Sequence, residues 1–109
     1  MQPQIRKVRH YFFNGKDLFQ EWLCGLKDLS AKVAIVKRIG RVMEGNFGDR
    51  RYVGEGVWEL RVHYGPGYRI YYGEDGPRVI LLICGGDKGA QQKGISRAIE
   101  LWAGYKRGK

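Results

Sequence analysis

The most constraining feature of the sequence is an alternating stretch over residues 58–73, WELRVHYGPGYRIYYG, with a Gly-Pro-Gly loop at its centre. Two alternating runs on either side of a short glycine-containing loop predict a β-hairpin. One face of this hairpin is apolar or aromatic, and we expect it to pack in the core. The expected register places Tyr64 opposite Tyr68, Val62 opposite Ile70 and Leu60 opposite Tyr72.

The other face of the predicted hairpin is polar. It carries Glu59, Arg61, His63, Arg69 and Tyr71. Arginine suits a phosphate site because its planar fork of donors matches phosphate oxygens and keeps its charge at any working pH. Such a face is either an anion site or an ordinary solvated surface in which Glu59 pairs with Arg61. The alternation leaves both interpretations open.

The charge of the chain favours a polyanionic partner. Twenty Lys and Arg residues stand against eleven Asp and Glu, a formal net charge of +9 in 109 residues. A positive field of this size attracts nucleic acid, an acidic protein or an anionic membrane surface. The membrane is the weakest of these partners, because no predicted helix joins a lysine-rich face to an aromatic insertion face.

Length and the absence of sorting signals indicate one cytoplasmic domain over residues 1–109. No apolar run approaches the roughly 18 residues of a membrane helix. The first ten residues are basic and lack the apolar stretch of a signal peptide. Cys24 and Cys84 have no nearby ligand partner at metal-binding spacing, so we expect two reduced, structural cysteines and no metal or cofactor.

The remaining elements follow from periodicity and capping signals. We expect a strand over 5–13, a helix over about 15–26 capped by Asn14, a second helix from about 30 to 45, a strand region entered at 52–53, an apolar central strand over 78–86, and a helix over 88–105 capped by Asp87. The short break between the first two helices predicts an antiparallel helical hairpin. In the central strand, alternation places Ile83 and Cys84 on opposite faces.

The second helix has an apolar stripe and several basic residues. We expect it to bury Val33, Val36, Ile39 and Met43 and to expose Lys32, Lys37, Arg38 and Arg41. This order of elements predicts an α+β fold, with helices packed on a small antiparallel sheet, an N-terminal strand and a C-terminal helix. Trp58, Tyr64, Tyr68 and Tyr72 share a period with the apolar residues, which favours core packing over base stacking.

The order of elements, together with VWELRVHYGPGYRIYY, VILLICGGDKGAQQKGI and the closing ELWAGY, resembles a known group of toxins. It is similar to the RelE/HigB-like toxins of bacterial type II toxin–antitoxin modules, in the small subfamily of addiction-module killer proteins. The resemblance covers essentially the whole chain and is sharpest over residues 58–93. It implies a RelE-like fold.

The resemblance implies a toxin that cleaves messenger RNA, usually in the ribosomal A site. A neighbouring antitoxin, often with a helix-turn-helix DNA-binding domain, holds such a toxin silent. The implied chemistry is attack of a ribose 2′-hydroxyl on the adjacent phosphodiester, without a metal. This reaction requires in-line positioning, stabilisation of charge on the phosphoryl oxygens, and a proton acceptor and donor.

Carried onto this sequence, the resemblance makes Arg69 in YRI the phosphate-stabilising arginine. Arg61 in ELR is either a second clamp or a surface ion pair. Lys88 follows GGD at a helix start, where it either attracts a phosphate or is simply solvated. The candidate RNA contacts, each of which is alternatively plain surface, are Arg50, Arg51, Gln91, Gln92 and Lys93.

The residues for proton transfer are less defined. Tyr71 is a candidate donor or a platform for base stacking. His63 titrates near neutrality and is a candidate proton shuttle. Glu59 is a candidate acceptor for the 2′-hydroxyl proton, or only the ionic partner of Arg61. The chain lacks the multiple-histidine pattern of some related toxins, so we do not transfer their mechanism.

Two other functions remain open from the sequence. A ParE-like toxin of the same superfamily poisons DNA gyrase and cuts no RNA. A non-catalytic RNA-binding regulator holds phosphates on its basic face and leaves no cleaved product. The basic residues in both YRI and GGDK favour the nuclease.

Overall fold

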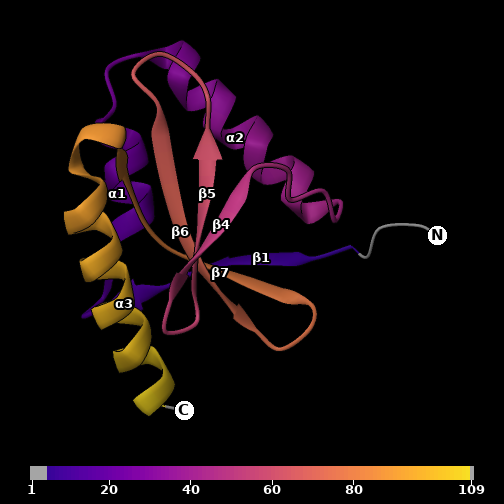
Figure 1. Ribbon diagram of the computed structural model, residues 1–109, viewed down its shortest axis with the longest axis vertical. Coiled ribbons are helices and arrows are strands. Elements are labelled where there is room, and N and C mark those ends of the chain that lie inside the picture. The colour runs from indigo at the N-terminus through magenta and orange to yellow at the C-terminus, as the bar shows by residue number, and fades with distance from the viewer. Residues whose placement is uncertain (1–4, 109) are drawn as a thin grey trace.

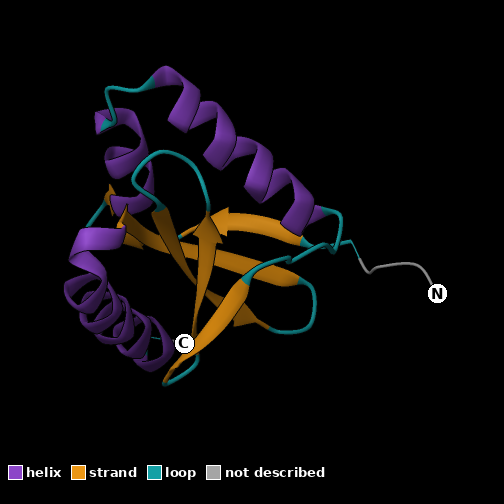
Figure 2. Cartoon of the chain, turned by 45° about the horizontal axis from the view of Figure 1, so that its top comes forward, coloured by secondary structure: helices purple, strands orange, loops and turns teal. Residues whose placement is uncertain are grey.

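A twisted five-stranded sheet with helices on both faces makes up the fold (Figure 1, Figure 2). The computed structural model describes residues 5–108. In chain order the elements are β1 (Lys7–His10), β2 (Phe12–Phe13), β3 (Lys16–Asp17), α1 (Leu18–Gly25), α2 (Leu29–Met43), β4 (Arg50–Gly54), β5 (Val57–Val62), β6 (Tyr68–Asp75), β7 (Val79–Asp87), the 3-10 turn η1 (Lys88–Ala90) and α3 (Gln91–Arg107). The order across the main sheet is β1-β7-β6-β5-β4, and only β1 and β7 are parallel. The predicted α+β class, with a mostly antiparallel sheet and a C-terminal helix, is confirmed.

Two hydrophobic cores lie on opposite faces of this sheet. On one face, Phe19 of α1 and Ile35 of α2 pack with strand residues such as Ile70. On the other face, Trp102 of α3 packs with Leu81 of β7. Figure 2 shows α2 above the strands and α3 to their lower left. The start of α3 reaches the polar side chains of the central hairpin, because Gln91 donates to Glu59 at 3.0 Å.

The predicted antiparallel hairpin of two helices is wrong. α1 starts three residues later than expected and is capped by Asp17, whose carboxylate accepts the Gln20 N–H at 3.0 Å. Asn14 and Gly15 have φ values of 51° and 76° and connect β2 to β3, since Asn-Gly favours a tight β-turn over a helix start. α1 packs chiefly on β7, while α2 crosses the sheet in another direction (Figure 1).

The predicted buried face of α2 is wrong except at Ile39, which is partly buried and packs against the core beneath α1 and α2. Val33, Val36 and Met43 are exposed. The buried residues of this helix are Ala31, Ile35, Arg38 and Val42. The predicted and the observed set both recur at helical spacing. The observed set contains Arg38, so it does not look like an apolar stripe in the sequence. Arg38 is only 6% exposed because its guanidinium donates to the backbone carbonyls of residues 47, 49 and 61.

The central hairpin has the predicted faces but another register. The observed pairs include Val62–Tyr68, Leu60–Ile70 and Trp58–Tyr72. This register differs from the predicted one by two residues. Because side chains alternate with a period of two, the shift keeps every strand residue on its expected face. Tyr64 leaves the strand and is 37% exposed, so its predicted place in the core is wrong.

Two irregularities shape the rest of the sheet. β4 and β5 are separate strands joined through Glu55 and Gly56, which have φ values of 53° and 88°. The sequence predicted one broken strand region there. The ladder between β6 and β7 contains a bulge, which places Ile83 and Cys84 together in the core beneath α3. The predicted placement of these two residues on opposite faces is therefore wrong.

Gly85→Ala tests the packing of α1 on β7. A Cβ at residue 85 would lie 2.3 Å from Cε3 of Trp22, so the indole ring must move. We expect the free energy of unfolding, measured by urea denaturation, to fall by about 1–3 kcal/mol. Gly86→Ala is the matched control, because a Cβ there meets no atom within 4 Å. Equal losses in the two variants would contradict this packing.

Candidate functional site

Two arginines face each other at the end of the central hairpin. Arg61 on β5 and Arg69 on β6 are direct cross-strand partners. Their side chains are 28% and 8% exposed, respectively. Like charges placed directly opposite destabilise a sheet unless an anion compensates them. The pair therefore requires a counter-charge, either from the protein or from a ligand.

The counter-charge within the protein is Glu59, whose side chain has no exposed surface. Its Oε1 lies 3.2 Å from Nε of Arg61 and 3.7 Å from Nε of Arg69. Oε2 accepts from the Tyr71 hydroxyl at 3.2 Å and from Nε2 of Gln91 at 3.0 Å. One carboxylate thus accepts a hydrogen bond from Nε of Arg61 and forms a longer ion pair with Nε of Arg69. The terminal nitrogens of Arg61 stay available to an anion.

A hollow of about 670 Å³, here called the arginine cleft, opens above these groups. It is lined by Arg51, Arg61, His63, Tyr64, Gly65, Pro66, Gly67, Arg69, Lys88 and Gln91. Four of these residues are permanent cations at neutral pH, and none of them is an acid. Lys88 is held beside the loop because its backbone N–H donates to the Gly67 carbonyl at 3.0 Å. The cleft therefore has the charge and the donors of an oxyanion site.

Tyr71 lies beneath the cleft. It is 1% exposed, and its ring contacts α3 at Gly94, where a Cβ would lie 2.8 Å from Cε2 of the ring. Burial and the nearby Glu59 carboxylate raise the pKa of Tyr71 well above its usual value. Tyr71 thus stays protonated and donates to Glu59, and its ring is not open to a stacking base.

His63 lies at the edge of the cleft and pairs with Asp49. Its Nε2 is 2.5 Å from Oδ2 of Asp49, and the two side chains are 70% and 43% exposed. This hydrogen bond holds the pKa of the Asp49 carboxyl below its usual value. When Nε2 carries the proton shared with an ionised carboxylate, Nδ1 of a neutral His63 is left as a proton acceptor. Sequence reasoning missed Asp49, because no spacing rule links residues fourteen positions apart.

The structure separates several predicted RNA contacts from the cleft. Arg51 and Gln91 line it, as described above. Arg50 instead lies over the rings of Phe47 and Trp58 and donates to the Tyr72 hydroxyl at 3.0 Å. Gln92 and Lys93 line a different hollow, formed with Phe13 and the outer face of α3. None of these three residues lines the arginine cleft.

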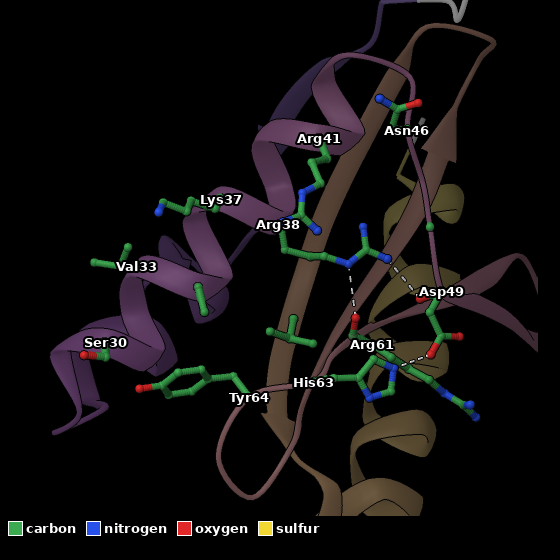
Figure 3. Close-up of a pocket in the computed structure, with 13 residues that line it drawn as sticks. Ser30, Val33, Lys37, Arg38, Arg41, Asn46, Asp49, Arg61, His63 and Tyr64 are labelled. Atoms are coloured by element: carbon green, nitrogen blue, oxygen red, sulfur yellow. Dashed lines mark hydrogen bonds and ion pairs between the residues drawn. The ribbon is translucent and has the colours of Figure 1, made fainter.

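A second hollow, here called the α2 hollow, adjoins the arginine cleft (Figure 3). It has a volume of about 520 Å³ and shares three lining residues with the cleft, namely Arg61, His63 and Tyr64. α2 supplies its basic wall. The sequence predicted Arg38 on the exposed side of α2, and the structure instead buries it in the lining of this hollow. The available signal was its spacing from Ile35 and Val42 on the buried stripe.

The described part of the chain has neither a metal-binding cluster nor a membrane-spanning helix. Within residues 5–108, no three His, Cys, Asp or Glu side chains lie close enough together to hold a metal ion. No helix in the same range is long and apolar enough to cross a membrane. Cys24 is exposed and Cys84 is buried, and neither forms a disulfide.

Comparison with known proteins places the chain in a family. No protein-family model matches it. It is 46% identical over 80 residues to a protein of Haemophilus influenzae described as uncharacterized, a match that spans 73% of this chain and 81% of that protein. The chain therefore belongs to the same family as the Haemophilus influenzae protein.

Glu59→Gln tests the role of the buried carboxylate. The substitution keeps the size of the side chain but leaves Arg61 and Arg69 opposed without a counter-charge. We expect a loss of about 3 kcal/mol in the free energy of unfolding, since removing one partner of a buried pair leaves an uncompensated charge. Glu100→Gln on the exposed face of α3 is the control, with an expected change below about 0.5 kcal/mol. A stable Glu59→Gln variant would contradict the anchoring role.

Proposed function

We propose that this protein is the toxin of a type II toxin–antitoxin module, a metal-independent endoribonuclease that cuts messenger RNA on the ribosome. The observation that carries the proposal is the cross-strand pair of Arg61 and Arg69, anchored from below by Glu59. Its position at one end of a helix-covered antiparallel sheet fits the RelE/HigB-like resemblance of the sequence. The net charge of +9 fits a polyanionic substrate.

The cleft offers groups for each part of the reaction. Arg69 and Arg61 stabilise charge on the non-bridging oxygens of the scissile phosphate, because they are held in place before the substrate arrives. The 2′-oxygen attacks phosphorus as its proton moves to Nδ1 of His63. The bond from phosphorus to the 5′-oxygen then breaks, and Lys88 supplies the proton that this oxygen takes up. The products are a 2′,3′-cyclic phosphate and a 5′-hydroxyl.

In this proposal Glu59, Gln91 and Tyr71 hold the two arginines in position and take no direct part in the reaction. Glu59 has both oxygens engaged by protein donors, so it orients the arginines instead of accepting the substrate proton. Gln91 links the start of α3 to the same carboxylate. Tyr71 completes the shell from below. These contacts keep the guanidiniums from collapsing into other pairings when the site is empty.

The same charge pattern defines the partners we propose. The substrate is messenger RNA in the ribosome, which sets the place of action in the cytoplasm. The silencing partner is a cognate antitoxin, expected to carry a helix-turn-helix DNA-binding domain and an acidic segment that covers the basic face.

Arg69→Gln tests the proposed reaction. Primer extension on a defined messenger in a translation extract, with and without ribosomes, reports the cuts and their ends. We expect ribosome-dependent cuts with cyclic-phosphate ends, reduced by about 10²–10³-fold in the variant because one oxyanion donor is lost. Arg78→Gln, at an exposed turn between β6 and β7, should cut like the wild type.

Two outcomes would overturn this function. Intact messenger at a toxin concentration that arrests growth would indicate a gyrase poison. Salt-sensitive RNA binding with no cleaved product would indicate a non-catalytic regulator. Because Arg69 is buried, Arg69→Lys and a circular dichroism spectrum should accompany the test. A folded Arg69→Lys variant that cuts at the full rate would also contradict a role for the guanidinium fork.

A further inference from the structure

The α2 hollow gathers positive charge that the protein itself does not neutralise. α2 contributes Lys37, Arg38 and Arg41 to its lining. Figure 3 shows Arg41 extending along the helix toward Arg38, with Lys37 at the outer rim. Asp49 is the acid among the lining residues, and its carboxylate is engaged by His63. The hollow thus has an excess of cations over anions.

Arg38 is a buried cation in the lining of this hollow, and its hydrogen-bonding capacity is only partly used. It is 6% exposed, and its Nε and Nη2 donate to backbone carbonyls. Its Nη1 is buried and has no hydrogen-bond partner among the described residues 5–108. A buried donor on a charged group normally has a partner, and leaving it unpaired is costly. Burial and the neighbouring Arg41 also lower the pKa of Arg38, which is the direction expected where positive charges crowd together.

Besides the polar residues Ser30, Asn46 and Asp49, the hollow has apolar and aromatic lining residues. Val33 and Ala34 of α2 and Val62 of β5 line one side. Tyr64 reaches from the hairpin loop toward Ser30 at the start of α2 (Figure 3). Cationic side chains beside an aromatic ring and apolar side chains suit a nucleotide, whose phosphate is charged and whose base stacks on aromatic and apolar groups.

The two hollows adjoin each other, because Arg61, His63 and Tyr64 contribute to the lining of both. A strand of RNA with one phosphate between Arg61 and Arg69 can therefore continue toward α2. We propose that the α2 hollow is a second nucleotide-binding subsite, which holds the phosphate and base of a nucleotide flanking the scissile one. This inference rests on the proposed function for its choice of RNA as ligand.

A length series of RNA tests this subsite without requiring cleavage. The probes are fluorescein-labelled 2′-O-methyl oligonucleotides of two and eight nucleotides, which lack the attacking hydroxyl. Fluorescence anisotropy measures their affinity across a range of salt concentrations. We expect the wild type to bind the octamer more than tenfold more tightly than the dinucleotide.

Lys37→Gln/Arg41→Gln should remove most of this length-dependent gain. Its plot of log affinity against log salt should be shallower by about 0.7, because the contact to one phosphate is lost and each such contact contributes about 0.7 for a single strand. The matched control, Lys16→Gln/Lys27→Gln, makes the same change in net charge at exposed positions outside both hollows. It should keep both the gain and the slope.

Tyr64→Ala tests base binding with no change in charge. We expect about tenfold weaker octamer binding, since loss of a stacking partner costs about 1–3 kcal/mol per base. The loss for the dinucleotide should be smaller but measurable, because Tyr64 also lines the arginine cleft. Phe12→Ala, an exposed aromatic outside both hollows, is the control and should bind as the wild type does.

Two outcomes would overturn the subsite. Equal losses in the two double variants would show that only net charge matters. Displacement of the octamer by an octa-glutamate peptide at lower concentrations than by unlabelled octamer would assign the hollow to an acidic protein segment. The proposed nuclease fails separately, because a wild type that cuts no messenger yet shows the length-dependent gain would keep the subsite and lose the reaction.

Discussion

The buried carboxylate of Glu59 is the interaction on which the rest of the site depends. It lies between β5 and β6 and contacts Arg61, Arg69, Tyr71 and Gln91. An isolated buried carboxylate would be very costly, and so would two opposed arginines without an anion. The carboxylate and the two guanidiniums therefore each lower the free-energy cost of burying the other. The contact with Gln91 also fixes the start of α3, so the charge cluster and the second core are built together.

The sheet face that contacts α3 has a hydrophobic core at one end and the arginine cleft at the other. Toward one end of that face, α3 covers Val57, Leu81 and Ile83 and completes a hydrophobic core. Toward the other end, the same strands present Arg61 and Arg69 to the cleft. Rigid strands hold these side chains more precisely than loops can, which suits pre-organised electrostatic stabilisation. On the face beneath α1 and α2, the side chains of the central hairpin are apolar or aromatic.

The sequence predicted the parts of the structure that depend on local pattern. Alternation in residues 58–73 identified Glu59, Arg61, Arg69 and Tyr71 as one face, and the prediction survived an error of two residues in register because the period is two. It failed where long-range contacts decide. Arg38 is buried because it donates hydrogen bonds to backbone carbonyls of distant segments, so α2 turns a different face to the core from the one expected. The His63–Asp49 pair and the separation of Arg50 from the cleft likewise arise only when β4 meets β5.

The central claim is that Arg61 and Arg69 form one phosphate site, and NMR of arginine side chains tests it directly. The Nε–H resonances of ¹⁵N-labelled protein are followed during titration with a 2′-O-methyl RNA dinucleotide. We expect the Arg61 and Arg69 resonances to shift together and to saturate with one dissociation constant. Arg50, which lies between aromatic rings away from the cleft, should not respond. Unsaturated drift of all three resonances, or unmoved Arg61 and Arg69, would contradict the account.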